Sequence, residues 1–106
     1  MLRAFSRLIG MLLLMVSTLV MANEIWIDVR TPDEYNAGHL HGAILIPYEE
    51  IAARISEVTS DKNARIRLYC RTGRRSGIAQ ETLQALGFTQ ATNEGGYEDL
   101  LRAGHQ

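Results

Sequence analysis

Residues 65–76 read RIRLYCRTGRRS, and in the first half of this stretch apolar and polar side chains alternate. The alternation of Ile66, Leu68 and Cys70 with polar neighbours predicts a β-strand that carries the cysteine inward at its carboxyl end. A loop rich in arginine and glycine follows, and Ser76 can cap a helix after it. A cysteine beside cations and a helix N-terminus has the setting that favours a thiolate.

The same loop has the composition of an anion cradle. If the backbone from Arg71 to Arg75 curls around the sulfur, its N–H groups converge on one point, and Gly73 supplies the left-handed bend that this requires. A thiolate beside a bound anion fits both sulfur transfer and phosphate chemistry. Cysteine phosphatases carry their arginine six positions after the cysteine, whereas Arg75 lies five positions after Cys70. The spacing therefore disfavours a phosphatase or an arsenate reductase.

Outside this stretch, short apolar runs alternate with amphipathic segments. Such alternation predicts one α/β domain with a mainly parallel sheet and helices on both faces. Ligands of such sheets bind beyond the carboxyl ends of the strands, where Cys70 would lie. The expected strands are residues 24–29, 43–46 and 65–70, with a weaker candidate at 88–92, and a tight turn is expected at Gly95-Gly96. The first expected helical segment is a turn capped by Thr31, with Glu34 placed to complete a capping box and also able to pair with Arg30. The others are residues 48–55, residues 76–86 with one apolar face and an end at Gly87, and residues 97–103.

The first 22 residues have the composition of a secretory signal peptide. Two arginines and no acid come first, a mainly apolar stretch follows over residues 8–16, and small or modest side chains end at Ala22. We expect export to the periplasm, cleavage after Ala22 and a mature domain over residues 23–106. An uncleaved membrane anchor is the alternative, but the apolar core is shorter than the roughly 20 residues that a membrane span needs.

Charge and cysteine content narrow the range of partners. Two of the eleven basic residues lie in the leader, which leaves nine basic and twelve acidic side chains and a formal charge of −3. Such a domain is a poor partner for nucleic acid, whereas the local cluster of arginines after Cys70 favours a small anionic ligand. The chain's one cysteine has no internal disulfide partner and is a candidate reactive thiol. His39 and His41, without a third ligand nearby, do not indicate a metal site.

Motifs along nearly all of the mature chain resemble the rhodanese family. The resemblance covers about residues 24–102 and is to the exported single-domain members of that family. The motifs that carry it are Ile27-Asp28-Val29-Arg30, Glu34-Tyr35, Gly38-His39 with Gly42-Ala43, Ile46-Pro47, the loop from Cys70 to Ser76, and Gly95-Gly96-Tyr97.

This resemblance implies a thiosulfate:acceptor sulfurtransferase that needs no cofactor. Cys70 would be the nucleophile and would hold the transferred sulfur as a persulfide until cyanide or a thiol removes it. Arg75 would brace the loop against a carboxylate such as Asp28. The other implied contacts are Arg71, Thr72, Gly73, Arg74 and Arg75 as binders of the anionic donor, and Asp28, Arg30 and Ser76 as supporting residues.

Other functions remain open beside this one. A sulfur carrier or a redox-sensing binding module would use Cys70 without turnover on thiosulfate. The intact cysteine and the complete loop favour the enzyme, because inert modules of the family typically lack the cysteine. We expect the domain to act as a monomer and to have no stable membrane association once the leader is removed.

Overall fold

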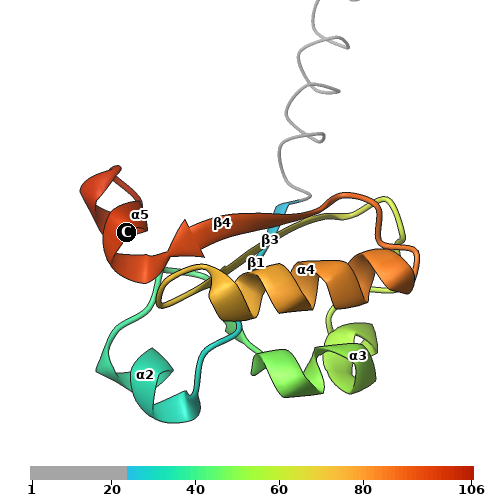
Figure 1. Ribbon diagram of the computed structural model, residues 1–106, viewed down its shortest axis with the longest axis horizontal. Helices are drawn as coiled ribbons and strands as arrows, with labels where there is room; N and C mark the ends of the chain where they lie inside the picture. The colour runs from blue at the N-terminus through green and yellow to red at the C-terminus, as the bar shows by residue number, and fades with distance from the viewer. Residues whose placement is uncertain (1–23) are drawn as a thin grey trace, which may run out of the picture.

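The computed structural model describes residues 24–106, so the expected leader and its cleavage point lie outside the described residues. Four parallel strands form a single sheet in the order β2-β1-β3-β4. The strands are β1 (Glu24–Asp28), β2 (Ile44–Leu45), β3 (Arg65–Cys70) and β4 (Ala91–Gly96). The helices are α2 (Pro32–Ala37), α3 (Ile51–Arg54), α4 (Arg74–Ala85) and α5 (Tyr97–Arg102) (Figure 1).

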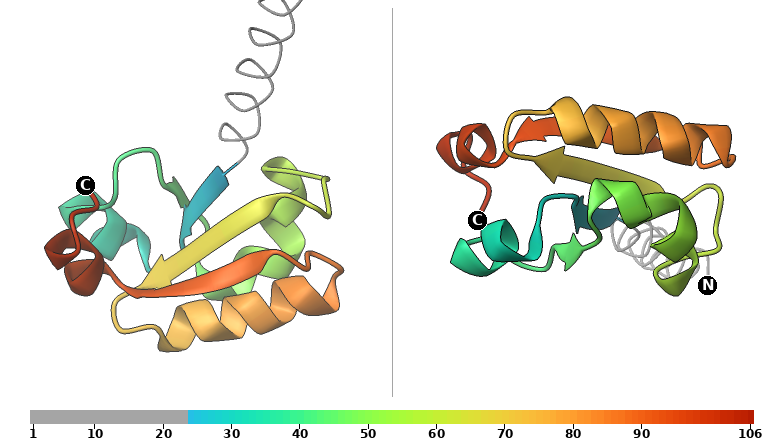
Figure 2. Two further views of the ribbon diagram at one scale, coloured as in Figure 1. Left: turned by 90° about the horizontal axis from the view of Figure 1, so that it is seen from above. Right: turned by 60° about the horizontal axis from the view of Figure 1, so that its bottom comes forward.

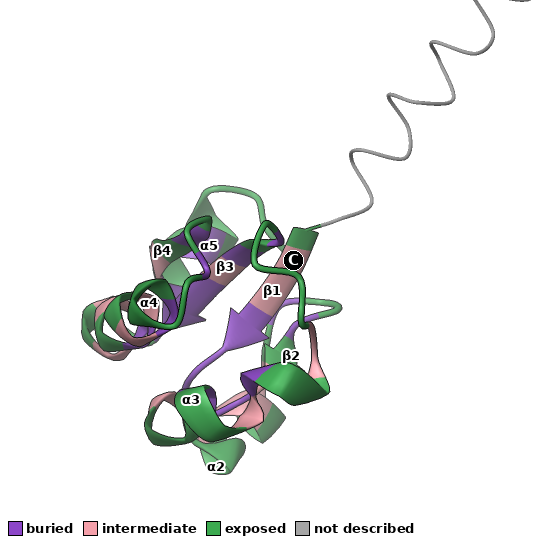
Figure 3. Cartoon of the chain, turned by 90° about the vertical axis from the view of Figure 1, so that its right-hand side faces the viewer, coloured by how far each residue is buried: buried purple, intermediate pink, exposed green. Residues whose placement is uncertain are grey.

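The sheet is covered on both faces, which confirms the predicted α/β class. Helices α3 and α4 lie against one face, where the larger apolar core forms (Figure 2). Helix α5 and the segment 38–43 pack on the other face around the buried ring of Tyr69. The buried parts of β1 and β3 lie toward their carboxyl ends, as Figure 3 shows, so the sheet is best protected where the cysteine is. Within residues 24–106 no helix is long and apolar enough to cross a membrane.

Several predicted elements are confirmed with small changes of extent. The strand at residues 65–70 is β3 as predicted, and Thr31 forms the predicted capping box with Glu34 at the start of α2. The helix expected over residues 48–55 is divided, because 3-10 turns at Tyr48–Glu50 and Ile55–Glu57 flank the short α3. Gly87 has a φ of 97°, which is the left-handed stop expected after α4.

The prediction that Ser76 caps α4 is wrong. The helix begins at Arg74, and its N-cap is Gly73, whose φ of 98° turns the chain directly from the loop into the helix. Ser76 is therefore buried inside the first turn, and its hydroxyl is used elsewhere. The predicted apolar face of α4 is also narrower than expected, because only Ala79 and Leu83 are buried while Ile78 and Leu86 stay exposed.

Two predictions near the end of the chain are misplaced along the sequence: the strand over residues 88–92 and the turn at Gly95-Gly96. The last strand is β4, Ala91–Gly96, so the two glycines belong to its end. Its polar and glycine-rich sequence has low strand propensity, but its backbone pairs with β3, with Gly96 opposite Cys70. A Cβ on Gly96 would lie 2.5 Å from the Arg71 carbonyl oxygen. Glycine at this point allows the loop after Cys70 to lie directly against β4.

Replacing Gly96 should therefore disturb the loop as well as the fold. We expect Gly96→Ala to lower the free energy of unfolding by about 1–3 kcal/mol, because the clash is with backbone and forces a shift. The change should also alter the rate at which iodoacetamide alkylates Cys70. Denaturant unfolding and alkylation kinetics measure the two effects.

Gly104→Ala is the matched control for this substitution. Gly104 has a φ of 99° and open space where its Cβ would be, so alanine costs about 1–2 kcal/mol of backbone strain without touching the loop. Its alkylation rate should equal that of the native protein. Equal alkylation rates in all three proteins would show that Gly96 does not position the loop.

Candidate active site

Cys70 ends β3 at the carboxyl edge of the sheet, where the pattern of alternation predicted it. The residue is free of disulfide bonds and fully buried, and its side chain faces α4. β1 ends beside it, with Asp28 opposite Tyr69 in the parallel register. This edge is where parallel sheets place their ligand sites.

Hydrogen-bond donors converge on the Cys70 sulfur. The Gly73 amide donates to Sγ at 3.0 Å, and the Ser76 hydroxyl oxygen lies 3.3 Å from it. Burial of the thiol opposes its ionisation, but the Ser76 hydroxyl together with the amides of Ser76, Thr72 and Gly73 outweighs that cost. The pKa of Cys70 is accordingly lowered from its ordinary value. The loop amides therefore converge on the sulfur as the sequence predicts, and binding of an anion by the loop stays a prediction.

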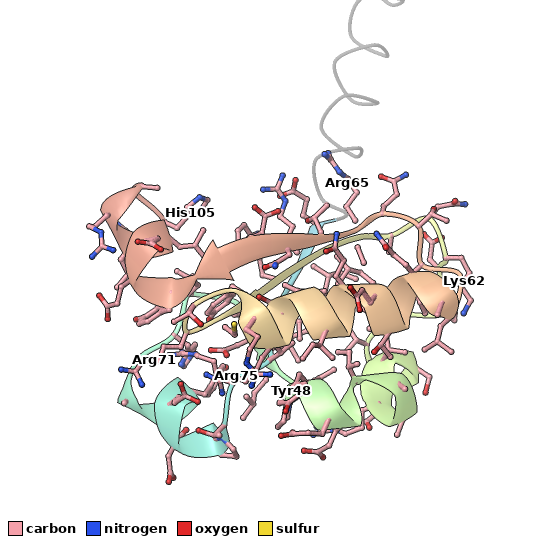
Figure 4. All side chains as sticks on the ribbon, in the orientation of Figure 1. Tyr48, Lys62, Arg65, Arg71, Arg75 and His105 are labelled. Atoms are coloured by element: carbon pink, nitrogen blue, oxygen red, sulfur yellow. The ribbon has the colours of Figure 1, made fainter. Side chains whose placement is uncertain are left out.

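The three arginines of the loop have two different environments. Arg71 and Arg74 are exposed, and no carboxylate among residues 24–106 forms an ion pair with either. Arg75 instead donates to both oxygens of Glu34, at 2.7 and 2.9 Å, which joins the start of α4 to α2. Figure 4 shows Arg71 and Arg75 at the end of the sheet nearest α2. The expectation that Arg75 braces the loop holds, but its partner is Glu34 and not Asp28.

The Glu34 carboxylate is held in its charged form. The pKa of Glu34 is lowered to about 2, mainly by its hydrogen bonds with Arg75. Burial of the carboxyl group acts in the opposite direction, and hydrogen bonds from Thr31 lower the pKa further. The same carboxylate closes the capping box by accepting from the Thr31 amide at 3.2 Å. One side chain thus serves both the start of α2 and the brace of the loop.

Asp28 and Arg30 form a buried ion pair at the end of β1. The Asp28 carboxylate accepts from the Arg30 side chain at 2.7 to 3.1 Å and from the Arg30 amide at 3.0 Å. Arg30 also donates to the Gly38 carbonyl at 2.7 Å, and its guanidinium lies over the Tyr97 ring. The expected pairing of Arg30 with Glu34 is therefore wrong. The pair of Asp28 and Arg30 connects the end of β1 with Tyr97 of α5, beside the end of β3 that carries Cys70.

The sequence analysis missed Asn93, on β4. Its amide nitrogen donates to the Gly73 carbonyl at 2.9 Å, and its amide oxygen lies 2.7 Å from the Ser76 hydroxyl. Asn93 lies in a stretch too polar to predict as a strand, so no pattern placed it near the loop. An asparagine two residues before a Gly-Gly pair was the available signal, because a short amide side chain there can bond to nearby backbone.

A cleft of about 350 Å³ opens beside the loop. Its charged lining comes from two arginines and two glutamates, Arg30, Arg71, Glu34 and Glu98, and Tyr97 adds an aromatic ring. No group of three or more side chains that could ligate a metal occurs within residues 24–106. The arrangement can hold a small anion near a thiolate through backbone amides and arginine side chains.

Comparisons with known proteins agree with this geometry. The family model for the rhodanese-like domain matches residues 15–103. The chain is 45% identical over 89 residues to thiosulfate sulfurtransferase PspE of Escherichia coli, covering 84% of this chain and 86% of that protein. It is 33% identical over 97 residues to the chloroplastic thiosulfate sulfurtransferase 16 of Arabidopsis thaliana, covering 81% of each.

A solved structure gives the same result in three dimensions. The structure described as rhodanese with anions from E. coli superposes with a TM-score of 0.69 at 46% identity, covering 72% of this chain and 89% of that one. The family match extends over most of the chain and includes the strand, the loop and the helix that surround Cys70. The chain belongs to the rhodanese-like domain family of sulfurtransferases.

Proposed function

We propose that this protein transfers the outer sulfur of thiosulfate to a thiophilic acceptor through a persulfide on Cys70. The observation that carries the proposal is the convergence of donors on the Cys70 sulfur, next to Arg71 and Arg74, which are exposed and form no ion pair within residues 24–106. A thiolate with a lowered pKa is a nucleophile, and arginines near it attract a dianion. The names of two relatives, both thiosulfate sulfurtransferases, support the same donor.

In the first half-reaction the Cys70 thiolate attacks the outer sulfur of thiosulfate. A new S–S bond forms on the cysteine, the S–S bond of thiosulfate breaks, and sulfite leaves with the bonding electron pair. The negative charge then resides on the terminal sulfur of the persulfide. Backbone amides that point at this region stabilise that charge as they stabilise the thiolate, so no cofactor is needed.

In the second half-reaction an acceptor removes the sulfur. Cyanide or a thiolate attacks the terminal sulfur, the persulfide S–S bond breaks, and the Cys70 thiolate is restored as the leaving group. The charge on the leaving thiolate is stabilised by the donors that lower the pKa of Cys70. One difficult transfer is thus divided into two displacements at sulfur. The cleft lined by Arg71 gives the acceptor a route to the loop.

The position of Arg75 argues against phosphate chemistry. A phosphatase of this type aims its loop arginine at the bound phosphate, but Arg75 gives both of its terminal nitrogens to Glu34. A sulfur carrier or redox sensor that does not turn over thiosulfate is the remaining alternative. It would load Cys70 but would not release sulfur to cyanide.

We also propose that the domain acts outside the cytoplasm. The basic and then apolar composition of residues 1–22 supports export to the periplasm, with residues 23–106 as the mature part. In that compartment an unpaired cysteine meets oxidants, and the chain offers it no partner for an internal disulfide.

The central prediction concerns turnover. The protein mixed with thiosulfate and cyanide should produce thiocyanate, and Cys70→Ser should reduce this at least about a thousandfold, because a hydroxyl at neutral pH is not ionised. After thiosulfate alone, mass spectrometry should find one added sulfur on Cys70. A sulfur adduct without thiocyanate would favour the carrier, and the absence of both from folded, reduced protein would exclude the sulfurtransferase.

A second prediction concerns the exposed arginines. Arg74→Ala should raise the KM for thiosulfate about two- to fivefold with little change in kcat, the size expected for one solvent-exposed charge. The increase should shrink at high salt, because ions screen the attraction. Arg54→Ala, on α3, is the control for a general loss of positive charge, since within residues 24–106 the ion-pair partners of Arg54 are Glu50 and Glu57. Equal KM values for the two variants would remove Arg74 from the donor-binding role.

A third prediction concerns the Glu34 brace. Because the pKa of Glu34 is lowered in the fold, to about 2, its contribution to stability is complete above its ordinary pKa and is lost as the pH falls toward 2. Glu34→Gln should abolish the part of the acid-induced loss of stability that comes from Glu34. It should also slow persulfide formation at neutral pH. Thermal unfolding as a function of pH measures the first effect. Glu50→Gln, in an exposed pair, should match the native protein in both, and similar behaviour of the two variants would contradict the brace.

A further inference from the structure

The side chain of Asn93 forms three hydrogen bonds although the residue is not part of the hydrophobic core. It is exposed on β4, yet its side chain reaches the loop after Cys70 and the first turn of α4. Its nitrogen donates to the Gly73 carbonyl, and its oxygen accepts from the Gly95 amide at 3.0 Å. These two backbone partners fix which end of the amide is oxygen, because a carbonyl can only accept and an amide N–H can only donate. The third contact, 2.7 Å from the same oxygen to the Ser76 hydroxyl, must therefore use the hydroxyl hydrogen.

The hydroxyl group of Ser76 has one hydrogen to donate and two possible acceptors within reach. Its hydroxyl oxygen lies 2.7 Å from the Asn93 oxygen and 3.3 Å from the Cys70 sulfur. A hydroxyl donates a single hydrogen bond, so it cannot donate to both acceptors at once. While Cys70 is a thiol, the S–H can donate to the Ser76 oxygen and the Ser76 hydrogen can stay on Asn93. Once Cys70 is a thiolate, the sulfur has no hydrogen, and the contact is favourable only if the Ser76 hydrogen turns to it.

We propose that Asn93 is a positioning residue that competes with Cys70 for the hydroxyl hydrogen of Ser76 and thereby sets how readily the sulfur becomes a thiolate. The geometry gives Asn93 a second effect on the same sulfur. By holding the Gly73 carbonyl it also restrains the residue whose amide donates to Sγ. The inference rests on the proposed function only in taking Cys70 as the nucleophile, and its test requires no turnover.

Charged groups near the sulfur act in parallel with this competition. From the start of α4, the charge of Arg75 is felt by Cys70, and Arg75 is itself held by Glu34 of α2. From β1, Asp28 is neutralised by its buried pair with Arg30. Arg71 and Arg74 are exposed on the loop. None of these groups contacts Asn93, so a change at Asn93 alters the neutral hydrogen bonds and leaves the arrangement of charges in place.

A double-mutant cycle isolates the shared hydrogen. Asn93→Asp keeps the size and the two acceptor contacts, makes the acceptor stronger, and loses the bond to the Gly73 carbonyl. The new negative charge and the loss of the bond to the Gly73 carbonyl affect the pKa of Cys70 whether or not Ser76 is present. Competition for the hydroxyl hydrogen affects it only when Ser76 is present. The cycle therefore compares Asn93→Asp in the native background with Asn93→Asp in the Ser76→Ala background. The readout is the rate of Cys70 alkylation by iodoacetamide in the full chain from about pH 5 to pH 10, which follows the thiolate fraction.

We expect Asn93→Asp to raise the pKa of Cys70, read from the alkylation profile, by about one unit when Ser76 is present and by about half a unit in the Ser76→Ala background, where one unit is a tenfold change in the ionisation constant. Ser76→Ala alone should raise the pKa of Cys70, because the thiolate loses a donor. Equal effects of Asn93→Asp in the two backgrounds, or an unchanged pKa in Ser76→Ala, would overturn the proposal.

Asn93→Ala provides the opposite sign and a check against a general effect of added charge. It removes the competing acceptor, so the Ser76 hydrogen becomes free for the sulfur. The change in the pKa of Cys70 caused by Asn93→Ala should be more negative in the native background than in the Ser76→Ala background. This coupling has the opposite sign to the coupling of Asn93→Asp with Ser76. Coupling of the same sign for both substitutions would contradict the competition. Thermal unfolding of each variant confirms that it is folded, and an active or inactive result with thiosulfate does not enter the comparison.

Discussion

The carboxylate of Glu34 joins the two halves of the chain at the edge of the site. It closes the capping box at Thr31, which fixes where α2 begins after β1. It also binds both terminal nitrogens of Arg75, which fixes the first turn of α4 relative to α2. A bidentate pair of this kind sets orientation as well as distance, so the loop between β3 and α4 has little freedom at its far end. The position of the cysteine relative to its donors depends on that restraint.

The sulfur itself is subject to two opposing demands. It lies in the apolar core between the sheet and α4, where a charge is costly, yet the proposed reaction needs a charge on it. The fold resolves this with short-range donors, since backbone amides and one hydroxyl point at the sulfur while the arginines stay outside. Amides of the main chain keep their direction when side chains change. The convergence of donors is therefore a property of the loop backbone, whose course depends on the left-handed Gly73 and on the close approach of Arg71 to Gly96.

Much of this structure could be predicted from the sequence, and the failures have a physical cause. The strand that ends at Cys70 and the capping box at Thr31 depend on local patterns of alternation and hydrogen bonding, and both were predicted correctly. β4 was misplaced because its residues have low strand propensity on the whole, and pairing with β3 makes them a strand. The partners of Arg30 and Arg75 were exchanged for a similar reason. Sequence spacing indicates which charges are near along the chain, but the choice between two carboxylates depends on how α2 and α4 meet.

The burial of Cys70 has a consequence for the timing of the chemistry. A residue with no exposed surface cannot be touched by any reagent while the loop keeps its resting shape. For the proposed sulfur transfer the loop over Cys70 would have to open, and an opening at Gly73 would break the hydrogen bond that the Gly73 amide gives to the sulfur. Loop motions of this size take nanoseconds to microseconds. In the proposed reaction, the opening that admits a donor would therefore also weaken the thiolate, and it would favour small reagents over bulky disulfides and oxidants.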